Sequence, residues 1–268
     1  MYDLGKPPLI VAHRGASAWA PENTLAAFRM AMEVGAEGIE FDVRLSRDGQ
    51  AVVIHDLTLE RTGRKAVSVS SLTAEELGRI DVGSWFNLSH QKKADPAFTR
   101  ETVATLAEAL EALQDFRGVI YIELKCKDSE VGQLSSAVCS AISASPLVPQ
   151  IIVKSFKLAV IPHLRFECPE VKTAALFAPK IMRYLRKGKH LVKIAEEFGA
   201  NHLSLHYSLA SRKLMKKVER SGMKVAIWTT DKPRWVRRAA ELGLFAIITN
   251  DPAKLLEAKY GRKVGREI

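Results

Sequence analysis

The sequence predicts a single (β/α)₈ barrel. Eight short apolar runs rich in β-branched residues recur along its 268 residues, and helical patterns lie between most of them. The length agrees with this fold, because such a barrel commonly fills about 250 residues as one domain. With 47% hydrophobic and 26% charged residues, the chain can bury a sizeable core. An open doubly wound sheet, which shows the same alternation, is the alternative.

Each expected strand is an apolar run of five or six residues. The runs lie at 9–13, 38–43, 119–124, 151–156, 172–177, 202–207, 224–228 and 245–249. Clear helical patterns lie at 23–34, 103–114, 209–222 and 232–243, with glycines near several helix ends, where a left-handed residue is favoured. Asn23 is expected to cap the first helix.

The alternation is broken by a ninth apolar run, AVVIH, which follows the second run after only seven residues. The dipeptide Asp48-Gly49 between them is a strong signal for a two-residue hairpin turn. Such a turn would place His55 opposite Asp42, on the strand face that also carries Glu40. A longer loop or a bulge would shift this pairing.

Residues 57–100 are rich in turns and mixed in character. We expect an insertion after the second strand and not a separate domain, because this segment is too short for an ample core of its own. The whole chain, residues 1–268, is therefore expected to form one domain. Trp85 and Phe86 would either cover the mouth of the barrel or pack within the insertion.

Polar or aromatic side chains end several of the apolar runs. In barrels of this class, the active site lies at the carboxyl ends of the strands, so these side chains are expected at one rim. They are His13 and Arg14 at the end of the first run, Glu40 and Asp42 in the second, His55 at the end of the ninth, Glu123 and Lys125 at the end of the third, and Trp228 at the end of the seventh.

Glu40, Asp42 and Glu123 would bring three carboxylates into one space, where they repel one another unless a cation neutralises them. Oxygen ligands suit Mg²⁺ or Ca²⁺ better than Zn²⁺. We therefore expect one divalent metal ion, Mg²⁺ or Ca²⁺, as the cofactor. The alternative is that the carboxylates form ion pairs with neighbouring arginine and lysine side chains.

Two histidines at one rim suit a general acid and a general base, because imidazole titrates close to neutral pH. One histidine alone would more often be structural, but His13 and His55 accompany three carboxylates. Arg14 and Lys125 add fixed positive charge that suits a phosphate group. Trp228 would form a wall against the substrate, or pack in the barrel without touching it.

The net charge of +10 is the one unusual bulk property. Part of it lies in the basic segment 179–193, which is either a solvated helix face or a weak contact for an anionic membrane surface. A nucleic-acid partner is not expected, because no recognisable nucleic-acid motif accompanies the charge. The sequence leaves the oligomeric state open.

Neither a signal peptide nor a membrane span is indicated, so a cytoplasmic protein is expected. The three cysteines, Cys126, Cys139 and Cys168, are odd in number and lack the spacing of a metal site. We expect buried or incidental thiols here and neither a disulfide framework nor a zinc site.

A series of motifs runs in order through nearly the whole chain. They are HRG at 13–15, PENT at 21–24, GIEFDVRLSRDGQAVVIHDLTLERT at 38–62, VGSWF at 82–86, ELK at 123–125, SF at 155–156, Trp228, and IITNDP at 247–252. Any one of them is weak, but the combination is specific. Together they resemble the glycerophosphodiester phosphodiesterase family.

This resemblance implies a TIM barrel with a small inserted segment after the second strand. It also implies metal-dependent hydrolysis of glycerophosphodiesters to glycerol 3-phosphate and an alcohol. The roles implied are acid/base catalysis for His13 and His55, metal binding for Glu40, Asp42 and Glu123, and phosphate contact for Arg14 and Lys125. In related enzymes, the glycerol 2-hydroxyl is thought to attack phosphorus, and water then opens the cyclic phosphate. Which histidine acts first as acid stays open.

The sequence departs from the family pattern at two places. WTTD stands at 228–231, where the family often has Trp-Thr-Val-Asn, and Thr249-Asn250 stands where it often has Thr-Asp. Neither departure is expected to touch the metal or acid/base residues. They therefore concern the glycerol side of the substrate.

Two alternatives to this function stay open. A lysophospholipase D-like enzyme acting on lysophospholipids is suggested by the basic segment 179–193, which also carries apolar residues. A noncatalytic anion-binding barrel belongs to a different class. The complete set of histidines, carboxylates and lysine argues against the second alternative.

Overall fold

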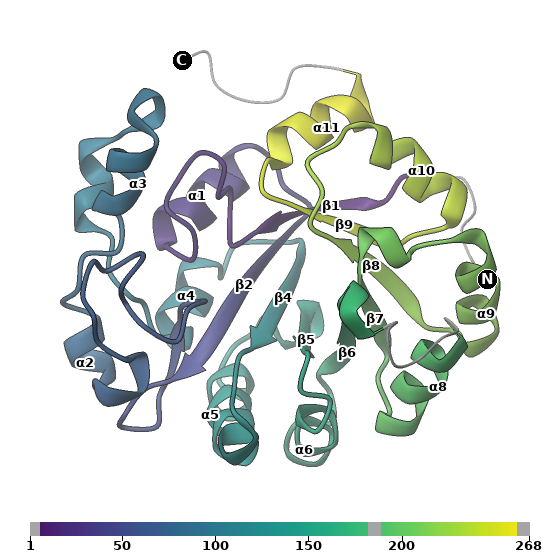
Figure 1. Ribbon diagram of the computed structural model, residues 1–268, viewed down its shortest axis with the longest axis horizontal. Helices are drawn as coiled ribbons and strands as arrows, with labels where there is room; N and C mark the ends of the chain where they lie inside the picture. The colour runs from purple at the N-terminus through teal and green to yellow at the C-terminus, as the bar shows by residue number, and fades with distance from the viewer. Residues whose placement is uncertain (1–5, 182–188, 262–268) are drawn as a thin grey trace.

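The computed structural model describes residues 6–181 and 189–261. Its parallel strands form a closed barrel with helices around the outside (Figure 1). Strand β1 (Leu9–His13) pairs in parallel with β2 (Gly38–Leu45) on one side and with β9 (Ala246–Thr249) on the other. This pairing closes the sheet, so the predicted (β/α)₈ barrel is confirmed and the open doubly wound sheet is wrong.

The other parallel strands follow in chain order around the barrel. They are β4 (Val119–Leu124), β5 (Ile151–Ser155), β6 (Lys172–Phe177), β7 (His202–His206) and β8 (Lys224–Trp228). The predicted runs match these strands closely, because strands buried on both faces are short, continuous apolar segments.

The outer helices follow the strands and cover the barrel. They are α1 (Leu25–Glu33), α4 (Leu106–Ala112), α5 (Val131–Ser143), α6 (Val160–Glu167), α8 (Lys189–Phe198), α9 (Arg212–Ser221), α10 (Arg234–Leu242) and α11 (Pro252–Tyr260). The cap predicted for α1 is wrong by one residue. Thr24 Oγ1 accepts a hydrogen bond from the Ala27 N–H at 3.2 Å, whereas Asn23 has a left-handed φ of 57° and points toward β2.

Apolar side chains fill the barrel interior below its carboxyl-terminal rim. Val11 and Tyr121, both fully buried, lie two residues before His13 and Glu123 on their strands. They belong to a cluster with Ile152, Ala174, Ala226, Ala246 and Ile248. This layer closes the barrel beneath the polar rim residues.

Strand β3 (Ala51–Val53) pairs antiparallel with β2, but the predicted register is wrong by one residue. Asp42 lies opposite Ile54 and not His55, because the Ile54 N–H donates to the Asp42 carbonyl at 3.0 Å. The loop has three residues, 47–49, and its glycine has a φ of 78°. The longer loop moves His55 beyond the paired part of β3.

The segment between β3 and α4 forms short helices beside the barrel. They are η1 (Val69–Ser71), α2 (Ala74–Leu77), α3 (Ser84–Ser89), η2 (Gln91–Lys93) and η3 (Pro96–Arg100). Phe86 is fully buried and packs with Phe98 of this segment and Ala27 of α1. The aromatic pair therefore contributes to local packing between the segment and α1.

The expectation of thiols is wrong for two of the three cysteines, although both are buried. Cys139 on α5 and Cys168 after α6 form a disulfide across 29 residues of sequence, whereas Cys126 is free. Helices α5 and α6 pack against each other. The pairing was hidden in the sequence because it depends on how α5 and α6 pack against each other.

The basic segment 179–193 is only partly covered by the described residues. Lys180 lies in the turn η6 (Pro179–Ile181), whereas Arg183, Arg186 and Lys187 lie outside the described residues. Membrane contact by this segment therefore stays a prediction. Among residues 6–181 and 189–261, no helix has both the length and the apolar character needed to cross a membrane.

Candidate active site

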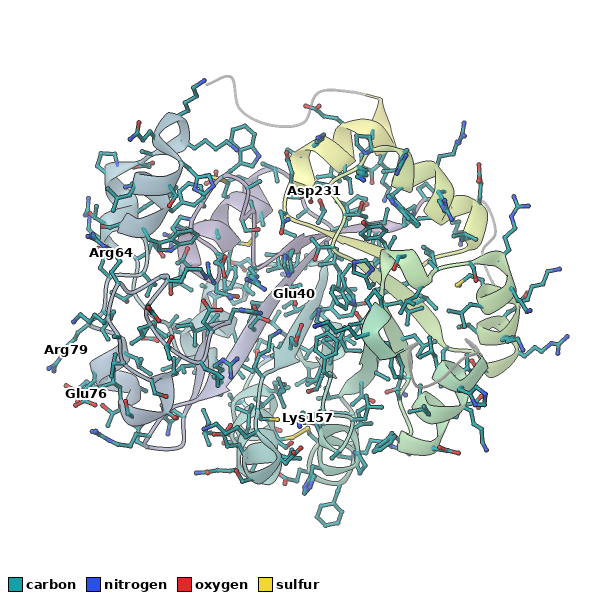
Figure 2. The ribbon with its side chains drawn as sticks, viewed as in Figure 1. Glu40, Arg64, Glu76, Arg79, Lys157 and Asp231 are labelled. Atoms are coloured by element: carbon teal, nitrogen blue, oxygen red, sulfur yellow. A yellow bond between two sulfur atoms is a disulfide. The ribbon has the colours of Figure 1, made fainter. Side chains whose placement is uncertain are left out.

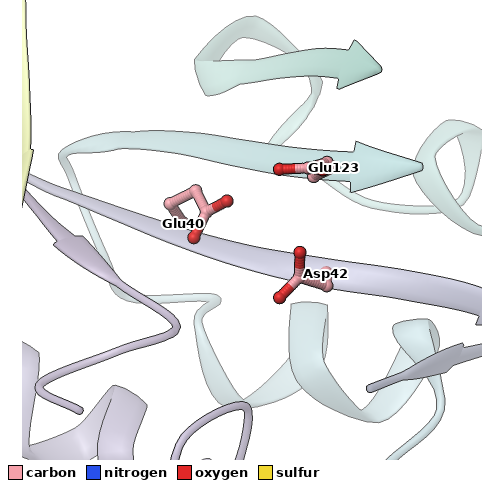
Figure 3. Close-up of side chains that lie close together, drawn as sticks. All are labelled: Glu40, Asp42 and Glu123. Atoms are coloured by element: carbon pink, nitrogen blue, oxygen red, sulfur yellow. The ribbon is translucent and has the colours of Figure 1, made fainter. Parts of the chain in front are cut away.

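The strand register brings the three predicted carboxylates together. Asp42 on β2 lies directly across from Glu123 on β4, and Glu40 lies two residues earlier on the same face of β2. Figure 3 shows these side chains converging from the two strands. One oxygen of each lies within 4.8 Å of the others, and no side chain of the three is more than about one-twentieth exposed. We call these three residues the carboxylate triad.

Each carboxylate of the triad has one buried oxygen that faces a lysine ammonium group. Lys154 Nζ lies 2.8 Å from Glu40 Oε1, and Lys125 Nζ lies 3.3 Å from Asp42 Oδ1 and also contacts Glu123 Oε1. The carboxylates therefore form the ion pairs that the sequence offered as the alternative to a metal ion. Three convergent hard oxygen donors also suit a divalent cation such as Mg²⁺ or Ca²⁺.

Arg14 and Lys125 lie beside the triad, as the sequence predicts. Arg14 Nε is 3.1 Å from Asp42 Oδ2, and Lys125 Nζ is 3.3 Å from Asp42 Oδ1 and also contacts Glu123. Burial alone would raise the pKa of Asp42, but the charges of Arg14 and Lys125 outweigh it and hold the pKa well below its usual range. Both cations are partly exposed, so they can also reach a ligand at the rim.

Lys154 is a site residue that the sequence analysis missed. It lies on β5, directly across from Glu123 on β4. Its Nζ is 2.8 Å from Glu40 Oε1 and 3.5 Å from Glu123 Oε2, and its side chain is 2% exposed. A signal was present in the sequence, because this lysine lies inside the apolar run IIVKSF, which was expected to be a buried strand. Lysine side chains are rarely buried unless they are paired.

Asn23 is a second site residue that the sequence analysis missed. It was predicted to cap α1, but its side chain contacts Asp42 of the triad. Its Nδ2 donates to Asp42 Oδ2 at 3.0 Å, and its Oδ1 accepts from the Asp42 backbone N–H at 3.1 Å. The amide therefore fixes both the backbone and the carboxylate of Asp42.

His13 lies at the end of β1 and contacts residues from both neighbouring strands. Its Nδ1 is 2.7 Å from Asn250 Oδ1, just after β9, and its Nε2 is 3.8 Å from Glu40 Oε2 on β2. Asp231 holds Asn250 in place, because its carboxylate accepts from the Asn250 N–H at 2.8 Å and from Nδ2 at 3.0 Å. Burial would raise the pKa of Asp231, but hydrogen bonds from Thr249 and Asn250 lower it overall.

His55 lies just after β3 and is linked to Arg14 by a chain of charged contacts. Its Nδ1 is 2.7 Å from Asp56 Oδ1, and Arg61 Nε donates to Asp56 Oδ2 at 2.7 Å. Arg61 also donates to Glu22 Oε1 at 2.7 Å, and Glu22 accepts from Arg14 at 2.7 Å. The sequence analysis missed the roles of Asp56, Arg61 and Glu22, although all three lie within quoted motifs.

Residues 13–254 match the model of the glycerophosphoryl diester phosphodiesterase family. The chain belongs to this family. A glycerophosphodiester phosphodiesterase of Caldanaerobacter subterraneus subsp. tengcongensis is 32% identical over 250 residues, which are 92% of this chain and 96% of that protein. The chain is accordingly a phosphoric diester hydrolase of the glycerophosphodiester phosphodiesterase type.

Solved structures of similar proteins have the same architecture. A phosphodiesterase of Oleispira antarctica, solved with the product sn-glycerol-3-phosphate, is 26% identical with a TM-score of 0.82, covering 94% of this chain and 96% of that chain. A glycerophosphodiester phosphodiesterase of Agrobacterium tumefaciens is 27% identical with a TM-score of 0.75, covering 92% of this chain and 98% of that chain.

The two departures from the family pattern lie next to His13. The expectation that neither would touch the predicted acid/base residues is wrong, because Asn250 contacts His13 directly. Asp231 contacts Asn250 in turn, so the two departures form one hydrogen-bonded unit. The sequence could not show this, because the contact crosses the closure of the barrel between β1 and β9.

Trp228 lies at the rim among other aromatic side chains. Its ring packs edge-on against Phe156 at 5.6 Å and against His206 at 5.3 Å between ring centroids. Phe156 is 44% exposed, and Lys125 Nζ lies 5.8 Å from the centre of its ring. In this member of the phosphodiesterase family, an apolar wall therefore adjoins the charged centre.

Proposed function

We propose that this protein is a metal-dependent glycerophosphodiester phosphodiesterase that releases glycerol 3-phosphate and an alcohol. The observation that carries the proposal is the carboxylate triad, which is buried, converges to within 4.8 Å and lies beside His13, Arg14 and Lys125. Support for the substrate class comes from the family and from the Oleispira antarctica phosphodiesterase, whose structure contains sn-glycerol-3-phosphate.

Glu40, Asp42 and Glu123 would hold one Mg²⁺ or Ca²⁺ ion. When bound, the ion supplies positive charge that stabilises the negative charge developing on the phosphate. Asn23 orients the Asp42 carboxylate through two hydrogen bonds and so keeps the ligand set in one geometry.

Arg14 and Lys125 would bind the phosphate oxygens. Both side chains are partly exposed at the rim and are held by carboxylates, which orients them before the substrate arrives. The wall of Trp228 and Phe156 would contact the uncharged part of the substrate.

His13 and His55 would act as the acid/base pair. One histidine takes the proton of the glycerol 2-hydroxyl as that oxygen forms a bond to phosphorus. The other protonates the alcohol oxygen as its bond to phosphorus breaks, which leaves a cyclic phosphate. In the second step the roles are exchanged, and water opens the ring to give glycerol 3-phosphate.

A lysophospholipase D-like activity is the second candidate, because the exposed ring of Phe156 beside Trp228 offers apolar surface at the rim. The test measures product release from a panel of glycerophosphodiesters and from lysophosphatidylcholine, each with Mg²⁺, Ca²⁺, Mn²⁺ or EDTA. We expect glycerol 3-phosphate from the water-soluble diesters with a divalent ion and none with EDTA. A strong preference for lysophosphatidylcholine would favour the second candidate. Binding without any turnover would favour a noncatalytic anion-binding barrel.

A further inference from the structure

Lys154 lies in the same row of the barrel as the carboxylate triad. The register pairs Asp42 with Glu123 and Glu123 with Lys154, across β2, β4 and β5. Figure 2 shows Glu40, the ion-pair partner of Lys154, close to the centre of the barrel. The ammonium group therefore lies among the carboxylates and not at the mouth of the site.

The burial of Lys154 distinguishes it from the two cations that are proposed to bind phosphate. Its side chain is 2% exposed, compared with 17% for Arg14 and 16% for Lys125. Its Nζ lies 2.8 Å from Glu40 Oε1 and 3.5 Å from Glu123 Oε2, so the ammonium is paired with two carboxylates of the triad. Lys154 is thus an internal cation of the site.

The charges of the carboxylate triad are balanced without a metal ion. Within the described part of the chain, one arginine and two lysine side chains form ion pairs with the three carboxylates of the triad. These cations are Arg14, Lys125 and Lys154. Addition of a divalent ion would leave the site with excess positive charge, which opposes binding in a buried, low-dielectric environment.

We propose that Lys154 makes metal binding depend on the anionic substrate. Because its ammonium contacts Glu40 Oε1 and is buried with the triad, a metal ion bound there would share the triad with it. A phosphate group at the rim adds negative charge and draws Arg14 and Lys125 toward itself, which relieves the excess. The ion then binds weakly alone and tightly with a phosphate ligand. This inference rests on the metal site of the proposed function.

The test is calorimetric titration of Mn²⁺ into the metal-free full chain, with and without sn-glycerol 3-phosphate. In the wild type, saturating sn-glycerol 3-phosphate should tighten Mn²⁺ binding by about tenfold or more. Lys154→Met should bind Mn²⁺ alone about tenfold more tightly, and the effect of sn-glycerol 3-phosphate should shrink. Lys154→Gln, which retains a polar group for Glu40, should show the same change and serves if the methionine variant does not fold.

The matched control is Lys157→Met. Lys157 lies three residues further along the chain, is exposed and pairs with Asp128, so its loss should leave Mn²⁺ affinity unchanged. Equal or weaker Mn²⁺ affinity in the Lys154 variants would overturn the inference while leaving the metal site in place. Absence of Mn²⁺ binding by every variant, with or without sn-glycerol 3-phosphate, would instead overturn the metal site itself.

Discussion

His13 and His55 differ in the partner of their Nδ1 atoms. Asp56 offers a carboxylate to His55, whereas Asn250 offers an amide oxygen to His13. Because Asn250 Nδ2 donates to Asp231, its Oδ1 faces His13, and an amide oxygen can only accept. His13 Nδ1 must therefore donate to Asn250 Oδ1, which fixes the ring with Nε2 facing Glu40 at the centre of the site.

The Asp231 and Asn250 pair should be needed for this orientation. Asp231→Asn removes the acceptor that fixes the Asn250 amide, so kcat should fall by about tenfold or more while KM changes little. Asn250→Asp should do the same, because it places two carboxylates in contact. The double variant restores one amide and one carboxylate and should recover most of kcat. Steady-state kinetics on glycerophosphocholine checks this, and a double variant no better than either single variant would contradict it.

The connection between β1 and α1 is the structural element that most directly shapes the site. Arg14 and Asn23 have φ values of 57°, and both side chains contact Asp42. Gly15 has a φ of 78°, and a Cβ added there would lie 2.6 Å from the Ala27 backbone carbon. The glycine of the HRG motif is therefore required for close packing of this connection on α1.

Gly15→Ala should destabilise the protein more than a substitution at a glycine that has a left-handed backbone but open space around it. We expect a loss of about 2 kcal/mol or more in the free energy of unfolding, from the left-handed conformation and the clash together. Gly35→Ala is the control, because Gly35 has a φ of 73° but open space around its Cβ position, and it should cost about 1 kcal/mol. Chemical denaturation measures both. Equal losses would show that the close approach to α1 contributes nothing.

The stability of the whole protein in acid should depend on a histidine that lies far from the carboxyl-terminal rim of the barrel. His202 begins β7, is buried, and packs edge-on against Phe245. Burial, together with the charges of Lys224 and Lys172, lowers the pKa of His202 to about 4. The unfolded chain then takes up the proton first as the pH falls.

Because the unfolded chain binds this proton more tightly than the folded protein, the folded state becomes less stable in mild acid. The contribution of His202 to the free energy of unfolding should be fully present above the pKa of about 6.5 that it has in the unfolded chain. This contribution should decline as the pH falls toward 4. His202→Phe should remove this part of the pH dependence, which is expected to be about 2–3 kcal/mol. Denaturation curves between pH 7 and about pH 4 provide the measurement. An unchanged pH dependence in the variant would contradict the assignment.

The barrel and most of the proposed site were predictable because both follow from local patterns. Apolar runs identified the strands, and the side chains ending those runs include the triad and both histidines. Lys154 was missed because its charge is neutralised by residues on other strands, and Asn250 because its contact with His13 spans 237 residues. The single-domain organisation and the cytoplasmic location stay predictions.

The central claim is that Glu40, Asp42 and Glu123 hold a divalent ion beside the phosphate of the substrate. The most direct test is a crystal structure with Mn²⁺ and sn-glycerol 3-phosphate, using anomalous scattering to locate the ion. We predict one anomalous peak among the three carboxylates, with the phosphate beside it and in contact with Arg14 and Lys125. A phosphate bound at the rim without any peak at the triad would contradict the claim.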